Sequence, residues 1–124
     1  MLATNILIIE DDPAITEILG DLLRSEGYAV ASATDGLAGL AALQAATPDL
    51  LLLDVMMPLL DGPSMLRRAA AAGIALPPVL LMTAGRPPDI DGLPIGAFVP
   101  KPFDVDQVLG EVARLVGKGR SNAG

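Results

Sequence analysis

Five side chains that could carry out chemistry stand at the ends of four apolar runs. Glu10 and Asp11 follow NILII, Asp54 follows four leucines, Thr83 ends VLLMT, and Lys101 follows AFVP. Neighbouring carboxylates repel unless protons or a divalent cation compensate them, and hard cations such as Mg²⁺ prefer oxygen ligands. A hydroxyl and an ammonium group are donors suited to a tetrahedral oxyanion. Together, such groups describe a site for phosphoryl transfer to an aspartate.

The apolar runs that precede these residues are predicted to be strands of one parallel sheet. Because four consecutive leucines cannot alternate between a buried and a wet face, the run 50–53 indicates a strand covered on both sides. Further strands are predicted over 5–10, 28–33, 79–83 and 97–100. The carboxyl ends of parallel strands share one edge of the sheet, so we expect the five side chains to lie close together there.

Helical periodicity separates the strands. Helices are predicted from Pro13 to Gly27, from Gly36 to Thr47, from Gly62 to about Gly73, and from Val105 onward, with Asp12 and Asp61 as cap or turn residues rather than ligands. The stretch 84–96 holds three prolines and three glycines, so a loop or single turn is expected there. The pattern predicts an α/β, flavodoxin-like, doubly wound five-stranded parallel sheet in the order 2-1-3-4-5. Helices would cover both faces, with a short or missing fourth helix.

Composition restricts the partners and the compartment. The 124 residues predict a single domain, with a core over about 4–117 and a tail over 118–124. Without cysteine or histidine there is no disulfide, thiol nucleophile or imidazole base, and any metal must rest on oxygen ligands. A net charge of −7 and few aromatic residues argue against nucleic-acid binding. Because no apolar run is long enough to span a bilayer, we expect no membrane contact and a cytoplasmic location.

Four motifs, in order, make the sequence similar to a response-regulator receiver domain, the phosphoacceptor half of two-component signalling. They are IIEDDPAI, LLLLDVMMPLLDG, LMTA and FVPKPF, and the likeness covers about residues 4–117. The resemblance implies that Asp54 accepts a phosphoryl group from a sensor histidine kinase or phosphotransfer protein, with Mg²⁺ as cofactor and Mn²⁺ as the alternative ion. Such a domain is not an enzyme beyond gaining and losing its own phosphoryl group. It would switch binding to a downstream target or output domain, with a phosphorylation-dependent homodimer among the expected partners.

The resemblance also assigns roles around Asp54. Asp11 would bind the metal directly, Glu10 directly or through a water, and Met56 through its backbone carbonyl, with Asp54 as a further ligand. The role of each carboxylate agrees with the preference of Mg²⁺ for oxygen.

Three further residues receive roles from the resemblance. Thr83 would bond one phosphoryl oxygen, and Lys101 would neutralise another. Phe98 aligns with the aromatic residue that changes rotamer on activation. The Lys101–Pro102 peptide bond is similar to one that is cis in the family, and proline lowers the energy of a cis bond to within about 1 kcal/mol of trans.

Two other functions stay open for the same residues. A pseudo-receiver would keep the fold as a protein-interaction module and would not respond to Mg²⁺ with beryllofluoride or a small phosphodonor. A phosphohydrolase could also form an aspartyl phosphate, but Val55 and Met56 follow Asp54 in place of a second aspartate two residues on. The loop expected over 84–96 departs from the family. Receiver domains ordinarily have a helix in this stretch, and that helix belongs to their usual output and dimer face.

Overall fold

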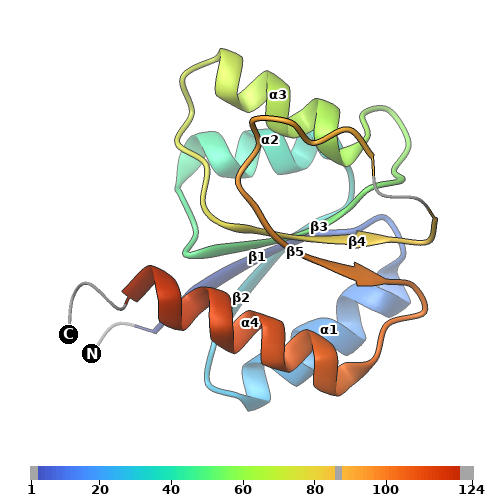
Figure 1. The fold of residues 1–124 in the computed structure, drawn as a ribbon, viewed down its shortest axis with the longest axis vertical. Helices are drawn as coiled ribbons and strands as arrows, with labels where there is room; N and C mark the ends of the chain where they lie inside the picture. The colour runs from blue at the N-terminus through green and yellow to red at the C-terminus, as the bar shows by residue number, and fades with distance from the viewer. Residues whose placement is uncertain (1–2, 86–87, 121–124) are drawn as a thin grey trace.

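A five-stranded parallel sheet lies between two layers of helices in the computed structural model, which describes residues 3–85 and 88–120 (Figure 1). The strands are β1 (Asn5–Ile9), β2 (Ala29–Ala33), β3 (Leu50–Asp54), β4 (Val79–Thr83) and β5 (Ile95–Pro100). The helices are α1 (Pro13–Ser25), α2 (Gly36–Ala45), α3 (Gly62–Ala71) and α4 (Val105–Arg120). The strand order β2-β1-β3-β4-β5 confirms the predicted flavodoxin-like fold. Within the described ranges, no helix is both long and apolar enough to cross a membrane.

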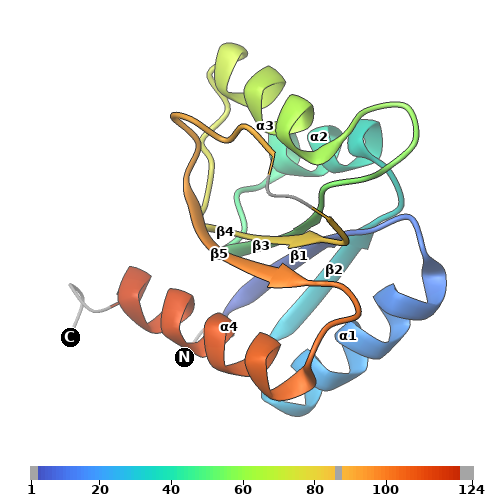
Figure 2. The ribbon, with the colours of Figure 1, turned by 45° about the vertical axis from the view of Figure 1, so that its right-hand side comes forward.

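The central strand β3 is buried on both faces, as its leucine run predicts. Leu50 and Leu52 belong to the apolar cluster under α1 and α4, whereas Leu51 and Leu53 belong to the cluster under α2 and α3. Figures 1 and 2 show these helix pairs on opposite faces of the sheet. None of the four leucines has exposed surface, and burying such a side chain contributes roughly 1.5–3 kcal/mol. The run therefore holds both helical layers to one strand.

An aspartate lies directly before the first residue of each helix, with its side chain bonded to the first turn. The side chains of Asp12, Asp35 and Asp61 accept main-chain N–H bonds of 2.9, 2.7 and 2.8 Å from the first turns of α1, α2 and α3. Each bond satisfies a donor that the helix itself leaves unpaired. The prediction that Asp12 and Asp61 are cap or turn residues is confirmed.

The bounds of several elements differ from the sequence prediction by one to three residues, and β5 and α4 are both longer than predicted. β5 begins at Ile95, two residues before the predicted start. α4 continues to Arg120, although a tail was predicted from residue 118, because glycine weakens a helix without removing a backbone donor as proline does. Residues 121–124 of that predicted tail lie outside the described residues.

The connection from β4 to β5 has no helix among its described residues, 84–85 and 88–94, in agreement with the expected loop. Arg86 and Pro87 lie outside the described residues. The Leu93 N–H donates to the Ile90 carbonyl at 2.9 Å, which closes a turn before β5. As predicted, β5 is an edge strand, and Pro100 at its end pairs with Thr83.

Leu59, in the loop between β3 and α3, predicts a stabilising substitution. Its φ is 72°, in the left-handed region, while its side chain is 78% exposed. That conformation costs a residue with a Cβ roughly 1–2 kcal/mol. Glycine at this position would remove that strain, but its greater backbone entropy in the unfolded chain offsets part of the gain. Leu59→Gly should therefore raise the free energy of unfolding by roughly 0.5–1 kcal/mol, measured by chemical denaturation.

Gly73→Ala is the matched control for Leu59→Gly. Gly73 has a φ of 78° with no atom within 4 Å of a Cβ placed on it, so alanine there should lower the free energy of unfolding through backbone strain alone. A loss of stability in both variants would contradict the strain assigned to Leu59.

Candidate functional site

The carboxyl ends of β1 and β3 bring three acidic side chains together. The two strands are neighbours, with Ile9 paired to Leu53, so Glu10 and Asp54 are the next residues on adjacent strands. Carboxylate oxygens of Glu10, Asp11 and Asp54 all lie within 4.8 Å of one another. Glu10 and Asp54 are buried, whereas Asp11 is exposed at the rim. The structure thus groups the three acids that the sequence predicted to converge.

Lys101 reaches this cluster from the chain that follows β5. Its Nζ lies 2.6 Å from Glu10 Oε1 and 3.2 Å from Asp54 Oδ2, so one ammonium group bridges two carboxylates. The lysine side chain is 18% exposed, and those of Glu10 and Asp54 are 0% and 5% exposed. An ion pair so shielded from water is stronger than a surface pair, but its members also lose more hydration.

The backbone holds Lys101 in this position. Its N–H donates to the Thr83 carbonyl at 2.8 Å, which extends the contact between β4 and β5 by one residue. The Lys101–Pro102 peptide bond is cis, as the resemblance implied.

Glu10 and Lys101 have altered pKa values. Burial, followed by a hydrogen bond with Asp54, raises the pKa of Glu10 to about 7 despite the opposing effect of Lys101. Burial lowers the pKa of Lys101, but its bond to Glu10 and the charge of Asp54 outweigh burial and leave that pKa raised. Lys101 is therefore an ammonium at neutral pH. One ammonium beside three carboxyl groups leaves an excess of negative charge that a divalent cation would offset.

Thr83 lies beside the cluster with its hydroxyl bonded to the following turn. Asp54 pairs with Met82, so Thr83 is one residue further along the neighbouring strand. The Thr83 hydroxyl accepts a bond from the Gly85 N–H at 3.2 Å and is 3.4 Å from the Gly85 carbonyl oxygen. The side chain is buried. A phosphoryl oxygen that accepted a bond from this hydroxyl would therefore replace its contact with the Gly85 carbonyl.

Met56 and Phe98 have different surroundings. The Met56 side chain is 71% exposed, and its N–H lies 3.4 Å from Asp54 Oδ1 in the turn after β3. Phe98 is half-buried against the apolar cluster under α2 and α3, with Leu81 as its partner on β4. The metal-binding carbonyl of Met56 and the switching ring of Phe98 stay predictions based on the resemblance.

Gly62 is a residue of the site that the sequence suggested only as a helix start. A Cβ at this position would lie 2.6 Å from the carbonyl oxygen of Asp54. The Gly62 N–H also donates to the Val55 carbonyl at 3.0 Å, which closes the loop back onto β3. A larger side chain would push the first turn of α3 away from Asp54. In the sequence, the Asp61-Gly62 pair indicates a turn at this position, but it does not indicate that Gly62 lies close to the carbonyl of Asp54.

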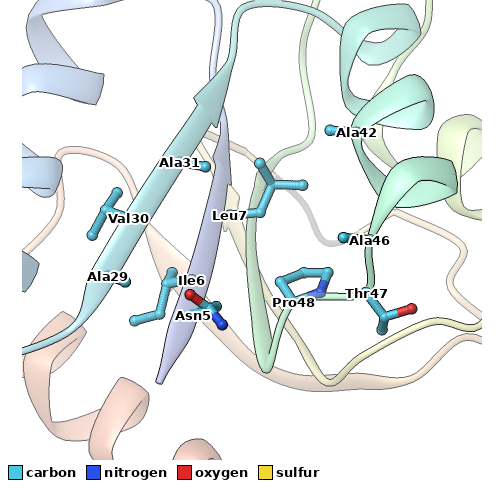
Figure 3. A pocket seen from close by; sticks show the side chains of 10 residues that line it. All are labelled: Asn5, Ile6, Leu7, Ala29, Val30, Ala31, Ala42, Ala46, Thr47 and Pro48. Atoms are coloured by element: carbon cyan, nitrogen blue, oxygen red, sulfur yellow. The ribbon is translucent and has the colours of Figure 1, made fainter. Parts of the chain in front are cut away.

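A separate cavity of about 360 Å³ lies far from the acids, between α2 and the amino ends of β1 and β2 (Figure 3). Small side chains such as Ala29, Ala31 and Ala42 line it, with Asn5 and Thr47 as its polar members. No titratable side chain is among its described lining, so the acidic edge remains the candidate site for chemistry.

Comparisons with known proteins show the family to which the chain is related. The family model of the response regulator receiver domain matches residues 6–113. The chain is 41% identical over 116 residues to RpaA of Synechocystis, a DNA-binding dual master transcriptional regulator, covering 90% of this chain and 48% of RpaA. The chain spans about half the length of the curated relatives it matches.

Solved receiver domains have the same fold. The receiver domain of the Francisella response regulator 1452 superposes with a TM-score of 0.82 at 27% identity, covering 93% of this chain and 98% of that one. The receiver domain of a Pseudomonas aeruginosa sensor histidine kinase, described with a magnesium ion coordinated in its active site cleft, gives a TM-score of 0.79 at 25% identity, covering 94% and 99%. The chain belongs to the response-regulator receiver family of two-component systems.

The raised pKa of Glu10 predicts a pH dependence of stability in the absence of divalent cations. Between the ordinary value of 4.5 and about 7, the folded protein keeps a proton on Glu10 that the unfolded chain releases. The free energy of unfolding should therefore fall as the pH rises through this window.

Glu10→Gln should flatten this dependence of the free energy of unfolding on pH, because an amide does not ionise. Urea denaturation in EDTA from about pH 4 to pH 8 measures the slope of the free energy of unfolding against pH. Glu17→Gln, on the exposed side of α1, is the control and should keep the wild-type slope. The same slope in Glu10→Gln would contradict the assignment.

Proposed function

We propose that the chain is a phosphorylation-dependent switch whose Asp54 accepts a phosphoryl group from a sensor histidine kinase or phosphotransfer protein. The observation that carries this proposal is the convergence of three carboxyl groups and the Lys101 ammonium at one edge of the sheet. Membership of the receiver family supports it. The pseudo-receiver alternative retains the fold, but a purely structural domain has no need of this costly cluster of buried charge.

The proposed transfer uses Asp54 as the nucleophile. A carboxylate oxygen of Asp54 attacks the phosphorus of a phosphohistidine, an O–P bond forms, and the P–N bond breaks with its electron pair left on the imidazole nitrogen. Lys101 is 3.2 Å from one Asp54 oxygen and would neutralise an oxygen of the transferred group. Thr83 would donate its hydroxyl to another. Hydrolysis of the acyl phosphate by water restores the Asp54 carboxylate and releases phosphate.

Glu10, Asp11 and Asp54 would hold Mg²⁺, or Mn²⁺ in its place, together with the Met56 carbonyl. The three carboxyl groups fit a hard divalent cation, because they supply oxygen ligands and an excess of negative charge in one small space. The ion, when bound, supplies positive charge that offsets the phosphoryl oxygens. Asp11 is exposed and leaves one side of this donor set open to solvent.

We propose that the only reactions of the chain are the gain and loss of its own phosphoryl group. The chain would then be a switch and not an enzyme acting on other substrates. We place it in the cytoplasm, where its kinase and a downstream target or output domain would meet it, and where a homodimer could form on phosphorylation. RpaA is described as DNA-binding, and its length is about twice the part matched here. The acidic charge of this chain favours output through protein contacts.

Conservative substitutions test the phosphoacceptor directly. With Mg²⁺ and radiolabelled phosphoramidate, Asp54→Asn and Asp11→Asn should lower labelling by at least about a hundredfold, because the first removes the nucleophile and the second a metal ligand. Asp12→Asn is the matched control: asparagine caps a helix about as well as aspartate, so labelling should persist. Labelling of Asp54→Asn at the wild-type rate, or no labelling of the wild type, would reject the proposed function.

The acyl phosphate is predicted to be long-lived. Met56 and Gly85 lie two residues beyond Asp54 and Thr83, and neither has a polar side chain that could orient an attacking water. After removal of the phosphodonor, the phosphoryl group should persist for minutes or longer, and Met56→Gln should shorten its lifetime. A wild-type lifetime of only seconds would count against this prediction.

A further inference from the structure

Arg67 of α3 holds the segment 88–93, which precedes β5 in place of a helix. Its Nη1 donates to the Asp91 carbonyl and its Nη2 to the Asp89 carbonyl, both at 3.2 Å, so one planar guanidinium binds two carbonyls of a single turn. Nη2 is also 3.8 Å from Asp89 Oδ1, but that side chain is 86% exposed and the ion pair adds little. The two main-chain bonds therefore fix the segment to α3.

Contacts within the segment and with the core complete this attachment. The Asp91 N–H donates to Asp89 Oδ1 at 3.1 Å, and Ile90 and Leu93 are half-buried against the apolar cluster under α2 and α3. Figures 1 and 2 both show the segment running beside α3. The segment thus has a polar anchor and an apolar anchor on the same side of the sheet.

Two features connect the acidic site with the contact between Arg67 and segment 88–93. A groove of about 370 Å³, lined by Met56, Ser64, Arg67 and Asp89 among others, runs from the turn after β3 to the segment. Along the chain, the Thr83 hydroxyl is bonded to the main chain of Gly85, at the start of the same connection. If Thr83 turns toward a group on Asp54, its hydroxyl donates to that group in place of the Gly85 carbonyl. The same rotation moves the hydroxyl oxygen away from the Gly85 N–H, which releases the start of the connection.

We propose that Arg67 is a positioning residue that couples segment 88–93 to α3, so that a change at Thr83 on phosphorylation reaches the second half of α3. The surface altered by phosphorylation would then be the face formed by α3 and segment 88–93. This inference rests on the proposed function, since the change begins at Asp54. Arg68 provides the contrast: it is the next residue on α3, is exposed, and its side chain makes no hydrogen bond or ion pair within the described part of the chain.

Amide hydrogen exchange of the full chain, without phosphodonor or metal, tests the attachment. In the wild type, the turn can open only if the two bonds from the Arg67 guanidinium break. Arg67→Gln removes those bonds, so the amides of Asp91 and Leu93 should exchange roughly five- to tenfold faster than in the wild type. Arg68→Gln should exchange at the wild-type rate. Equal rates in the two variants would overturn the proposal.

NMR shift mapping with Mg²⁺ and beryllofluoride tests the coupling. Wild type and Arg68→Gln should show shifts at Thr83, at 89–93 and at 67–71, whereas Arg67→Gln should keep the Thr83 response and lose that at 67–71. An unchanged 67–71 response in Arg67→Gln would overturn the coupling and leave the proposed function intact. Absence of any wild-type response at Asp54 and Thr83 would overturn both.

Discussion

The ammonium of Lys101 between two buried carboxylates is the interaction on which the site depends. Glu10 directly follows β1 and Asp54 ends the adjacent β3, so the fold forces them together whether or not their charges are balanced. Lys101 lies within 3.2 Å of both and compensates one charge. The remaining negative charge would suit a divalent cation and, under the proposed function, a phosphoryl group beside that cation. The same charges would be expensive in a domain used only as a scaffold.

Rigid elements on both faces keep these side chains in place. The leucines of β3 join two apolar clusters, so the strand that ends at Asp54 is held from both sides. At the end of that strand, the missing Cβ of Gly62 lets α3 approach the carbonyl of Asp54. β5 then delivers Lys101 from the sheet edge through a main-chain bond to Thr83. By contrast, segment 88–93 is joined to α3 by the side chain of Arg67, and we propose it as the part that responds to the site.

The sequence predicted the sheet and its acidic edge because both depend on local patterns. Apolar runs ending in charged or hydroxyl residues determined the strands, and the topology of parallel sheets placed Glu10, Asp54 and Thr83 at one edge. Contacts between distant residues had no such signal. Sequence spacing could not show that Lys101 lies nearer to Glu10 than to Asp54, that Gly62 touches the backbone of Asp54, or that Arg67 holds residues more than twenty positions away. The late end of α4 was missed because glycine lowers helix propensity without setting a boundary.

The most direct test of this account is the stability of Lys101→Met, measured by urea denaturation near pH 8 with EDTA and again with saturating Mg²⁺. Without the ammonium, Glu10 and Asp54 face each other uncompensated, so the free energy of unfolding in EDTA should fall by roughly 2–4 kcal/mol, and Mg²⁺ should restore most of the loss. Wild-type stability of the variant in EDTA, or a loss that Mg²⁺ does not relieve, would contradict the claim that this edge of the sheet is a cation-dependent cluster of charge.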